Sequence, residues 1–460
     1  MSVLPVGFGS AVAGGFQIER SLRFNSADSA YLNRTPASAG NRKTWTFSFW
    51  FKRGLISDNV IFGSRNASVT TVGYIGFQSD KFDFQFGATG NRIQDAAVRR
   101  DPGAWAHYVV VCNTTSATST DRMQLWVNGV RVTTFTTTSY PTQNADSDFN
   151  VADVHAIGRY GAQAAQYVDG YLTEVNFIDG QALTPSSFGE TNSNTGVWQP
   201  IKYTGTYGTN GFYLNFSDNS SNTATTIGKD YSGNGNNWTP NNISVTAGST
   251  YDSMTDVPTL TSATAANYCV MNPLFKFSYT GSNAGTFSDG NLKVATGGNP
   301  TQFAGTLELC DGAYYEITAV SIDVNRSYIG LFSPSLSNLT TNTSAVAYNA
   351  TYNVLYSNNG EVFVNTSSGS NLFGTVSSWT NGSVISVAYK AGKIYLAKDG
   401  VWQNSGVPAS GTGFVASGWD AYGALLPYCG YNSTFSANFG QQPFIYTPPT
   451  GFVALNTYNL

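Results

Sequence analysis

Apolar and polar residues alternate with a period of two over many short segments of the chain, which is the pattern of β-strands. Residues 45–51, WTFSFWF, show it most clearly, and the phenylalanines of residues 75–87 continue it. The side chains expected on one face of these segments are Trp45, Phe47, Phe49, Phe51, Phe82, Phe84 and Phe86. Residues 105–113, WAHYVVVCN, form a nearly continuous apolar run. Such a run predicts a strand that is buried on both faces.

Two dipeptides between alternating runs predict tight β-hairpins. Asn128-Gly129 separates the apolar positions of residues 123–127 from those of residues 130–135, and Asp399-Gly400 stands in the same position within YLAKDGVW. Asn-Gly and Asp-Gly adopt the positive φ angles that a two-residue hairpin turn requires. Each dipeptide therefore predicts two neighbouring antiparallel strands.

The distribution of these signals divides the chain into an N-terminal arm and two β regions. Residues 1–20 are small, apolar and rich in glycine, and we expect them to be an arm, either an anchor that docks into a larger assembly or a frayed terminus. Residues 21–262 form the first region, of which residues 200–262 are an extension rich in Asn and Gly with one predicted strand, GFYLNF. Residues 263–460 form the second, and a boundary is expected near residues 255–265. We predict an all-β fold with two antiparallel, jelly-roll-like β-sandwiches.

Composition supports this fold class. Charged residues make up 11% of the 460 residues, against about 25% in a typical domain, so the chain is poor in the residues that favour exposed helices. Aromatic residues make up 14%, which is too many for a disordered chain. The net charge of −4 and the lack of a basic patch argue against nucleic acid as a partner. No apolar stretch approaches the roughly 18 residues of a membrane span, so no membrane insertion is expected.

The four cysteines, Cys112, Cys269, Cys310 and Cys429, are far apart and form no C-x-x-C pair. They predict buried thiols rather than a zinc site or a disulfide scaffold. No Lys or Arg precedes the apolar part of the N-terminus, which argues against a signal peptide. We therefore expect a protein that is made in a reducing cytoplasm.

The residues that could carry chemistry are few. The two histidines are His107 and His155, and His107 lies in an apolar run, where a buried structural histidine is the simpler interpretation. A glycosidase needs two carboxyl groups about 5–10 Å apart. The pairs considered, Glu174 with Asp179 and Glu316 with Asp323, have odd sequence separations and would lie on opposite faces of a regular strand. We predict no catalytic residue and no cofactor.

Two kinds of residue could bind a ligand: aspartates, which could bind calcium, and aromatic residues, which could bind sugars. Asp153, Asp169 and Asp179 could ligate calcium through oxygen, but turn-forming aspartates are the simpler interpretation, and no metal site is predicted. Aromatic rings in turn-like segments could stack on sugar rings, although packing within the protein explains them equally well. The residues that we predict to bind ligand are Trp402, Trp419, Tyr422 and Tyr428, and Trp198 and Trp238 were also considered.

The first region resembles the concanavalin A-like, laminin-G-like lectin/glucanase sandwich. The resemblance covers about residues 20–190 and is carried by the order of SLRFNSADSAYL, WTFSFWF, WAHYVVVCN, MQLWVNGVRV and AIGRYGAQAAQYVDGYLTEVNFIDGQALT. The later GKDYSGNGNNW is similar to a segment that usually begins such domains. We therefore expect GFYLNF and the loop after it to pack back onto the first sandwich, as in a circular permutation.

Residues 285–445 resemble a SPRY domain through FSDGNLKV, YYEITAV, SYIGLFS, NGSVISVAYKAGKIYLAKDGVW and FSANFGQQPF. The pairing of the two modules, with the tail YTPPTGFVALNTYNL, resembles bacteriophage virion proteins. This resemblance implies a structural or receptor-binding component of the particle surface and no catalysis. It also implies a homo-oligomer, for example a trimer, that is attached to other virion proteins through the N-terminal arm.

The function predicted from these resemblances is that of a tail fibre or adhesin subunit that contacts a glycan or protein on the host surface. A head fibre or capsid decoration protein is an alternative, and the lack of shaft repeats in the sequence favours it slightly. A polysaccharide depolymerase is the enzymatic alternative. A secreted bacterial lectin fits less well, because no signal peptide is evident.

Overall fold

The computed structural model describes residues 15–64, 72–278, 285–296, 301–323, 327–334, 352–366 and 369–460. The chain forms two compact units, of which the first ends at Thr259 and the second begins at Leu260. This division falls within the stretch 255–265, where a boundary was expected. Each unit is built from two large sheets of almost entirely antiparallel strands, so the predicted all-β class is confirmed.

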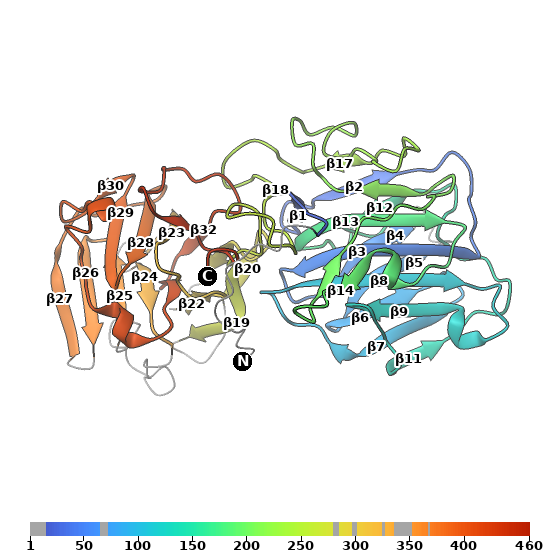
Figure 1. Cartoon of the computed structure of the whole chain (residues 1–460), viewed down its shortest axis with the longest axis horizontal. Coiled ribbons are helices and arrows are strands. Elements are labelled where there is room, and N and C mark those ends of the chain that lie inside the picture. The colour runs from blue at the N-terminus through green and yellow to red at the C-terminus, as the bar shows by residue number, and fades with distance from the viewer. Residues whose placement is uncertain are drawn as a thin grey trace. The chain divides into compact units, whose positions relative to one another are not determined.

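One sheet of the first unit has β3 and β13 at its centre (Figure 1). Its strands, in spatial order, are β10 (Val130–Arg131), β9 (Met123–Val127), β8 (Trp105–Asn113), β3 (Thr44–Arg53), β13 (Gly170–Asp179), β1 (Ser21–Phe24) and β18 (Ser253–Met254), and β16 (Phe212–Leu214) also pairs with β13.

The opposite sheet of the first unit also has eight strands. In spatial order they are β11 (Phe135–Ser139), β7 (Arg92–Val98), β6 (Lys81–Gln85), β5 (Gly73–Gln78), β4 (Asn59–Ser64), β12 (His155–Ile157), β2 (Tyr31–Arg34) and β17 (Thr239–Asn241). The remaining elements are the hairpin β14 (Gly189–Thr191) and β15 (Trp198–Pro200) and the 3₁₀ turns Ser119–Asp121 and Pro185–Ser187.

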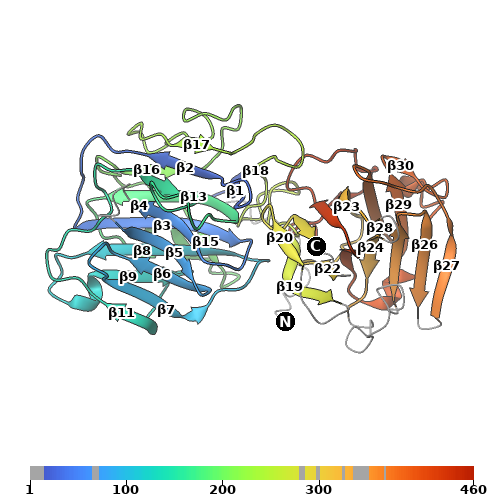
Figure 2. The same ribbon diagram turned by 180° about the vertical axis from the view of Figure 1, so that it is seen from behind.

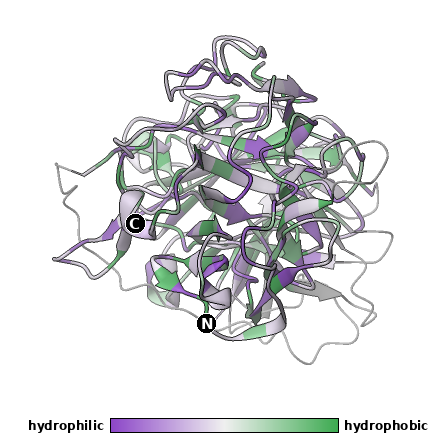
Figure 3. Ribbon diagram, turned by 90° about the vertical axis from the view of Figure 1, so that its right-hand side faces the viewer, coloured by the Kyte–Doolittle hydropathy of each residue, from purple (hydrophilic) through white to green (hydrophobic). Residues whose placement is uncertain are grey.

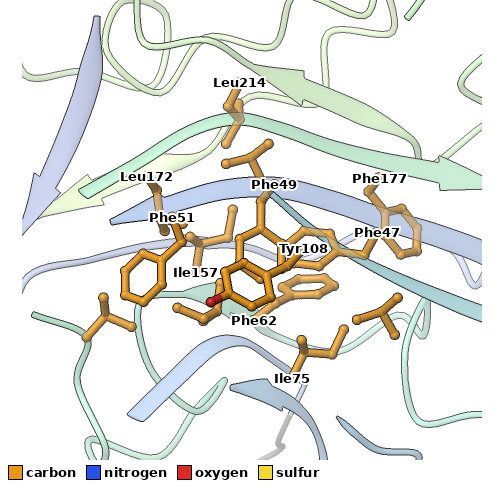
Figure 4. Packing of buried hydrophobic residues seen from close by; sticks show 14 of the residues in the cluster. Phe47, Phe49, Phe51, Phe62, Ile75, Tyr108, Ile157, Leu172, Phe177 and Leu214 are labelled. Atoms are coloured by element: carbon orange, nitrogen blue, oxygen red, sulfur yellow. The ribbon is translucent and has the colours of Figure 1, made fainter. Parts of the chain in front are cut away.

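The core of the first unit lies between these two sheets and is rich in aromatic rings (Figure 4). All seven aromatic side chains predicted on one face of residues 45–51 and 82–86 are buried in it. Phe47 stacks on Phe62 at 4.6 Å, and Phe49 stacks on Tyr108 at 5.5 Å. In β8, Val110 packs into this core, while Val109 packs into a second cluster on the other face of the sheet. The prediction that β8 is buried on both faces is therefore confirmed.

Local backbone geometry confirms the predicted hairpin in the first unit. Asn128 has a φ of 48° and Gly129 a φ of 78°, as a two-residue turn between antiparallel strands requires. Val127 and Val130 are paired across the turn. A second irregularity, which the sequence did not signal, is a β-bulge in β13 at Glu174, whose φ is 51°.

The extension packs back onto the first sandwich, as predicted. β16 pairs with β13 through Val175–Leu214 and Phe177–Phe212, and Figure 2 shows the two strands side by side. β17 pairs with β2 on the opposite sheet. Trp238, which precedes β17, is 1% exposed and belongs to the core. The extension therefore contributes β16 and β18 to one sheet and β17 to the other, and it completes the first unit.

Part of the predicted N-terminal arm is packed onto the first unit. Ile18 is 3% exposed, and its backbone N–H donates to Thr259 Oγ1 at 3.3 Å. The backbone carbonyl of Arg20 accepts a hydrogen bond from Thr173 Oγ1 at 2.8 Å. Residues 15–20 therefore belong to the sandwich, which corrects the arm's expected limit at residue 20. Residues 1–14 lie outside the described part of the chain.

The second unit is a separate pair of sheets. In spatial order, one contains β19 (Met271–Ser278), β22 (Thr301–Gly305), β31 (Leu426–Gly430), β24 (Tyr328–Phe332), β25 (Asn353–Ser357), β26 (Glu361–Thr366) and β27 (Gly369–Thr375). The other contains β20 (Thr286–Ser288), β21 (Lys293–Ala295), β32 (Thr434–Asn438), β23 (Ala313–Ser321), β28 (Val384–Lys390), β29 (Lys393–Lys398) and β30 (Val401–Trp402), with β33 (Val453–Ala454) beside β23. Among the described residues of this unit, 3₁₀ turns occupy Pro408–Ser410 and Trp419–Tyr422.

A hydrogen bond joins the two sheets of the second unit. Tyr315 Oη, on β23, donates to the carbonyl of Gly330, on β24, at 2.5 Å.

The predicted turn at Asp399 and Gly400 is confirmed by φ angles of 49° and 77° and by the pairing of β29 with β30. Figure 3 shows hydrophobic and hydrophilic residues interspersed along the ribbon of the whole chain. Within the described residues, no helix has the length and apolar character needed to cross a membrane.

Candidate functional site

A small cavity lies where the extension closes the first unit. Four aromatic residues of the core form much of its wall, and a group of polar side chains completes it. The lining residues are Arg34, Pro36, Phe62, Asn150, His155, Phe177, Asn210, Phe212 and Trp238. Its volume of about 10 Å³ is room for about one water molecule.

The loop before Trp238 is held in place by one buried carboxylate. Asp230 accepts hydrogen bonds from the backbone N–H groups of Tyr213 (2.9 Å), Ser232 (2.8 Å) and Asn236 (2.8 Å). Trp238 then packs edge-to-face against Phe212, with 4.8 Å between ring centroids. These bonds explain how a glycine-rich loop fixes an indole at the end of the sandwich.

His155 is a neutral wall of the cavity. Its Nε2 accepts a hydrogen bond from the backbone N–H of Asn150 at 3.1 Å, and its Nδ1 donates to the carbonyl of Asp153 at 2.9 Å. Burial lowers the pKa of His155 to about 4. Because both ring nitrogens are engaged and the ring is uncharged near pH 7, His155 contributes shape and has no proton to exchange there.

A polar network supports the other side of the cavity. Asn150 Nδ2 donates to Asp179 Oδ1 at 2.6 Å, and the backbone N–H of Asn210 donates to Asp179 Oδ2 at 3.1 Å. Asn210 Nδ2 donates to Asn150 Oδ1 at 2.9 Å. Asp179, considered above as a calcium ligand, thus accepts hydrogen bonds from two asparagines of the cavity wall.

Arg34 and Trp238 supply the hydrogen-bond donors of the cavity. Arg34 Nη1 donates to the carbonyl of Asn210 at 3.4 Å, and Nη2 donates to Asn236 Oδ1. Burial lowers the pKa of Arg34, and the charge of Asp230 opposes that change. Trp238 Nε1 is buried and has no hydrogen-bond partner among the described residues.

The predicted ligand-binding aromatic residues do not form one site, and two of them are buried. Trp419 is 1% exposed and Tyr428 is 3% exposed, so neither ring has a face free to stack on a sugar. Trp402 and Tyr422 are half-buried. Trp419 and Tyr422 are adjacent at 5.1 Å, whereas Trp402 packs against Tyr314 and Tyr428 against Phe332. Trp419 and Tyr428 are therefore packing residues of the second unit, and Trp402 packs at the edge of one of its apolar clusters.

The paired carboxyl groups considered for hydrolysis have separate environments. Glu174 accepts hydrogen bonds from Tyr213 Oη at 2.7 and 2.9 Å, and burial raises its pKa to about 8. Asp179 belongs instead to the asparagine network described above. Glu316 accepts hydrogen bonds from the backbone N–H groups of Ile445 (2.9 Å) and Tyr446 (2.8 Å), whereas Asp323 accepts from Asn432.

His107 is a buried structural histidine, as expected. Its Nε2 is 2.8 Å from Ser48 Oγ, and its Nδ1 accepts a hydrogen bond from Trp198 Nε1 at 3.1 Å. Burial lowers the pKa of His107 to about 3. Trp198, weighed above as a sugar-binding residue, is half-buried over this ring, with the two ring centroids 6.0 Å apart.

The remaining candidates are the four cysteines and the aspartates considered as metal ligands. All four cysteines are buried free thiols, as predicted. In the part of the chain that the structure describes, no three His, Cys, Asp or Glu side chains are grouped so that they could hold a metal ion. Asp169 lies 3.4 Å from both the backbone nitrogen and the hydroxyl of Ser26.

Sequence reasoning missed Arg34, Asn150 and Asn210 as site residues. Arg34 ends a short strand, and the two asparagines are ordinary members of a chain rich in this residue. The one available signal was GKDYSGNGNNW, which was expected to pack onto the first sandwich and which carries Trp238 into the cavity wall.

The comparison with protein families concerns the first unit. A family model described as the concanavalin A-like lectin/glucanases superfamily matches residues 25–187. This match confirms the resemblance found over about residues 20–190. A search of curated protein sequences gives no significant match.

Solved structures with similar folds have low sequence identity and low TM-scores. Domains LG4-5 of the mouse laminin alpha1 chain are 9% identical, with 97% of each chain covered and a TM-score of 0.29. The SPRY domain of human HERC1 is 16% identical, with 32% of this chain and 87% of that chain covered and a TM-score of 0.25. A heptameric SAP-like pentraxin from Limulus polyphemus is 16% identical, with 36% and 78% covered and a TM-score of 0.27.

We draw no functional conclusion from likenesses at this level, and the SPRY resemblance of residues 285–445 stays a prediction. The family match is the firmer finding, although it spans only part of the chain. Residues 25–187 are thus similar to the concanavalin A-like lectin/glucanase superfamily, and the lectin-type sandwich suggests a binding role.

Proposed function

We propose that the chain is a non-enzymatic, receptor-binding component of a tailed bacteriophage particle. In this proposal it is a tail fibre or adhesin subunit on the virion surface that contacts a glycan or protein of the host cell. The observation that carries the binding role is the match of residues 25–187 to a lectin-type superfamily. The assignment to a phage particle rests on the resemblance of the two-module sequence to virion proteins.

The dispersal of the acidic side chains supports binding rather than hydrolysis. A glycosidase places two carboxyl groups on either side of one bond. Glu174 is bonded to Tyr213 and Glu316 to the backbone of residues 445–446, so each has a structural partner in its own unit. The superfamily includes glucanases as well as lectins, and for that reason catalysis is one outcome of the experiment below.

Attachment and copy number complete the proposal. Residues 1–14 remain the proposed anchor to other virion proteins, now that residues 15–20 are assigned to the first unit. A homo-oligomer such as a trimer would present several copies of each unit to the cell. Several weak contacts made together can exceed the affinity of one contact by 10² to 10⁴, which an adhesin of modest single-site affinity requires.

A head fibre or capsid decoration protein is the second candidate. The observation that favours it is the lack of coiled-coil heptads, collagen triplets and short β-helix repeats in the sequence. In this candidate, another subunit projects the chain from the particle.

The test is to locate the protein on particles whose genome encodes it and to measure its action on the host surface. Gold-labelled antibody against the purified chain is expected to label the tail tip in electron micrographs. Labelling over the capsid would select the second candidate, and a lack of label on intact particles would contradict both. Incubation with host surface polysaccharide is expected to give binding without release of reducing ends.

A further inference from the structure

The chain enters and leaves the first unit side by side. The entry segment, residues 18–24, contacts the exit segment, residues 252–259, although 241 residues separate Ile18 from Thr259. The backbone N–H of Ile18 donates to Thr259 Oγ1 at 3.3 Å. β1, in the entry segment, pairs antiparallel with β18, in the exit segment (Figure 1). A pull on the two ends of the unit therefore reaches this contact before it reaches the rest of the sandwich.

Two buried ion pairs hold the exit segment in place. Arg23 Nε lies 2.9 Å from Asp252 Oδ1, and Lys52 Nζ lies 2.7 Å from Asp256 Oδ2. None of the four side chains is more than 5% exposed, and among the ion pairs of the described residues these two are the most deeply buried. A buried pair adds little net stability, but separating its charges in a medium of low dielectric constant is costly. The exit segment is therefore attached by contacts that resist being separated.

Asp256 joins the exit segment to three strands of the sheet. Its Oδ1 accepts a hydrogen bond from Trp105 Nε1 at 2.8 Å, and its backbone carbonyl accepts one from Ser21 Oγ at 2.6 Å. With the ion pair to Lys52, these bonds connect one residue to β8, β1 and β3. Asp256 follows β18 in the sequence. A pull applied at the end of the exit segment therefore reaches Asp256 before it reaches β18.

We propose that tension along the chain passes through the contact between the entry and exit segments, and that the two buried ion pairs set the force at which the first unit opens. This rests on the proposed function, because tension arises in a chain that is anchored at one end and bound to a cell at the other. Since β1 and β18 are antiparallel, the chain before β1 and the chain after β18 leave the contact in the same direction. The bonds are therefore loaded one after another, and the core is loaded only after they have broken.

The experiment pulls the full chain at the two ends of the first unit. Handles are attached through Gly15→Cys and Ala263→Cys, which are exposed positions on either side of the contact, whereas the four native cysteines are buried. The rate of opening at constant force is measured in an optical trap. Opening of the whole unit is recognised by its length, because the 241 residues between Ile18 and Thr259 add roughly 800 Å at about 3.3–3.6 Å per residue.

Asp256→Asn removes the negative charge beside Lys52 and keeps an oxygen for Trp105. It is expected to raise the rate of opening at a given force by about tenfold, because this pair is broken before the unit opens. Asp80→Asn is the matched control. Asp80 pairs with Arg53 at 3.0 Å in the same unit, with 13% and 5% of the side chains exposed, and belongs to neither segment. This variant is expected to lower the free energy of unfolding in urea while leaving the rate of opening under force nearly unchanged.

Ser21→Ala is the second variant, and it keeps the question open to test if Asp256→Asn fails to fold. It removes the hydroxyl that donates to the backbone carbonyl of Asp256 and leaves both ion pairs in place. The rate of opening under force is expected to rise by a smaller factor than in Asp256→Asn, because one neutral hydrogen bond is lost.

Equal effects of Asp256→Asn and Asp80→Asn on the rate of opening would overturn the inference, and so would an unchanged rate in Asp256→Asn or, if that variant does not fold, in Ser21→Ala. Gold labelling of particles is independent of this measurement. A chain that labels the tail but opens at a rate that ignores these contacts keeps the proposed function and loses this inference. A chain that opens as expected but labels no particle keeps the mechanical role of the contact and loses the proposed function.

Discussion

The two units attach one of their hairpin turns to the preceding strand through the same pair of hydrogen bonds. In the first unit, the backbone N–H of Asn128 donates to the carbonyl of His107, and the backbone N–H of His107 donates to Asn128 Oδ1, both at 2.8 Å. In the second unit, Asp399 and Val384 exchange the same two bonds, also at 2.8 Å. Each turn residue has a φ near 50°, and its side chain ties the hairpin to the preceding strand.

The units differ in how a strand from their C-terminal part is attached to a strand near the centre of a sheet. In the first, β16 pairs antiparallel to β13, and the phenol of Tyr213 bonds to Glu174. In the second, β33 pairs parallel to β23, and Glu316 accepts two backbone N–H groups from the segment before it. Both glutamates are buried, with 6% and 1% of their surface exposed.

Burial raises the pKa of both carboxyl groups, and their hydrogen-bond donors oppose that rise. For Glu316 these donors are the backbone N–H groups of Ile445 and Tyr446 and the phenol of Tyr314. Glu174 has one phenol as its hydrogen-bond donor, and burial raises its pKa to about 8. At pH 7 Glu174 therefore carries a proton. The hydrogen bond between Glu174 on β13 and Tyr213 on β16 thus involves a neutral carboxyl group.

The largest expected effect comes from an ion pair that belongs to the first unit alone. Lys52 Nζ lies 2.7 Å from Asp256 Oδ2, and both side chains are fully buried. Lys52→Met removes the cation beside the buried carboxylate of Asp256, which is expected to destabilise the first unit by about 3–5 kcal/mol. Hydrogen exchange of the full chain, followed by mass spectrometry, measures the loss in each unit separately.

Lys398→Met is the matched control in the second unit. Lys398 and Asp399 form a pair at 3.2 Å that is partly exposed to solvent, so its loss is expected to cost less than about 1 kcal/mol. Similar effects of the two substitutions would show that burial does not distinguish the pairs.

The second prediction concerns the hydrogen bonds that Glu316 accepts from the backbone of residues 445–446 in the second unit. Glu316→Leu removes the acceptor of the N–H groups of Ile445 and Tyr446, which is expected to cost about 3 kcal/mol. Glu316→Gln keeps one acceptor oxygen and is expected to lose less. Increased exchange confined to residues 439–456 would support this account, whereas an unchanged segment in the Leu variant would contradict it.

The third prediction is a pH dependence specific to the first unit. Because the folded-state pKa of Glu174, about 8, exceeds its ordinary value of 4.5, the folded state holds this proton to a higher pH than the unfolded state does. The contribution to stability is therefore fully present below pH 4.5 and is lost as the pH rises through 8. Between pH 6 and pH 9 the first unit is expected to lose about 2 kcal/mol from this group.

Glu174→Gln cannot ionise and is expected to abolish that loss while keeping an oxygen for Tyr213. Urea denaturation of both chains at pH 6, 7.5 and 9 makes the comparison. If the free energy of unfolding changes equally with pH in the two chains, Glu174 is ionised in the folded protein. The assignment of a neutral carboxyl group to Glu174 would then be wrong.

The smallest expected effect tests the similarity of the hairpins. Asn128→Ala and Asp399→Ala each remove one side-chain acceptor and place alanine at a positive φ, so each is expected to cost about 1–2 kcal/mol in its own unit. Asn128→Asp and Asp399→Asn exchange the two turn residues and are expected to change stability by less than about 0.5 kcal/mol. A large loss in one exchange variant only would show that the two turns are not equivalent.

Much of the fold could be predicted because strand faces and tight turns are local properties. The alternation at Trp45, Phe47 and Phe49 depends only on the period of a strand, and Asn128-Gly129 determines its own turn. The bulge at Glu174 was not predictable, because no glycine or proline marks it. The packing of Ile18 was missed for a related reason, since its partner Thr259 is 241 residues away in sequence.

The candidate site was harder to predict than the fold. Trp419 and Tyr428 stand in turn-like or mixed sequence, and their burial depends on contacts from distant strands. The cavity likewise gathers Arg34, Asn150 and Trp238 from three separate parts of the first unit. The proximity of these residues is a property of the tertiary fold. It cannot be predicted from the identity of single residues in a chain rich in Asn.

The central claim is that this chain binds a surface glycan and leaves its bonds intact. The most direct measurement is one incubation of the purified chain with host surface polysaccharide, in which bound protein and released reducing ends are both followed over time. We predict saturable binding with no increase in reducing ends above the protein-free control. Sustained release that disappears in Glu174→Gln or Glu316→Gln would contradict the claim and make the protein a depolymerase.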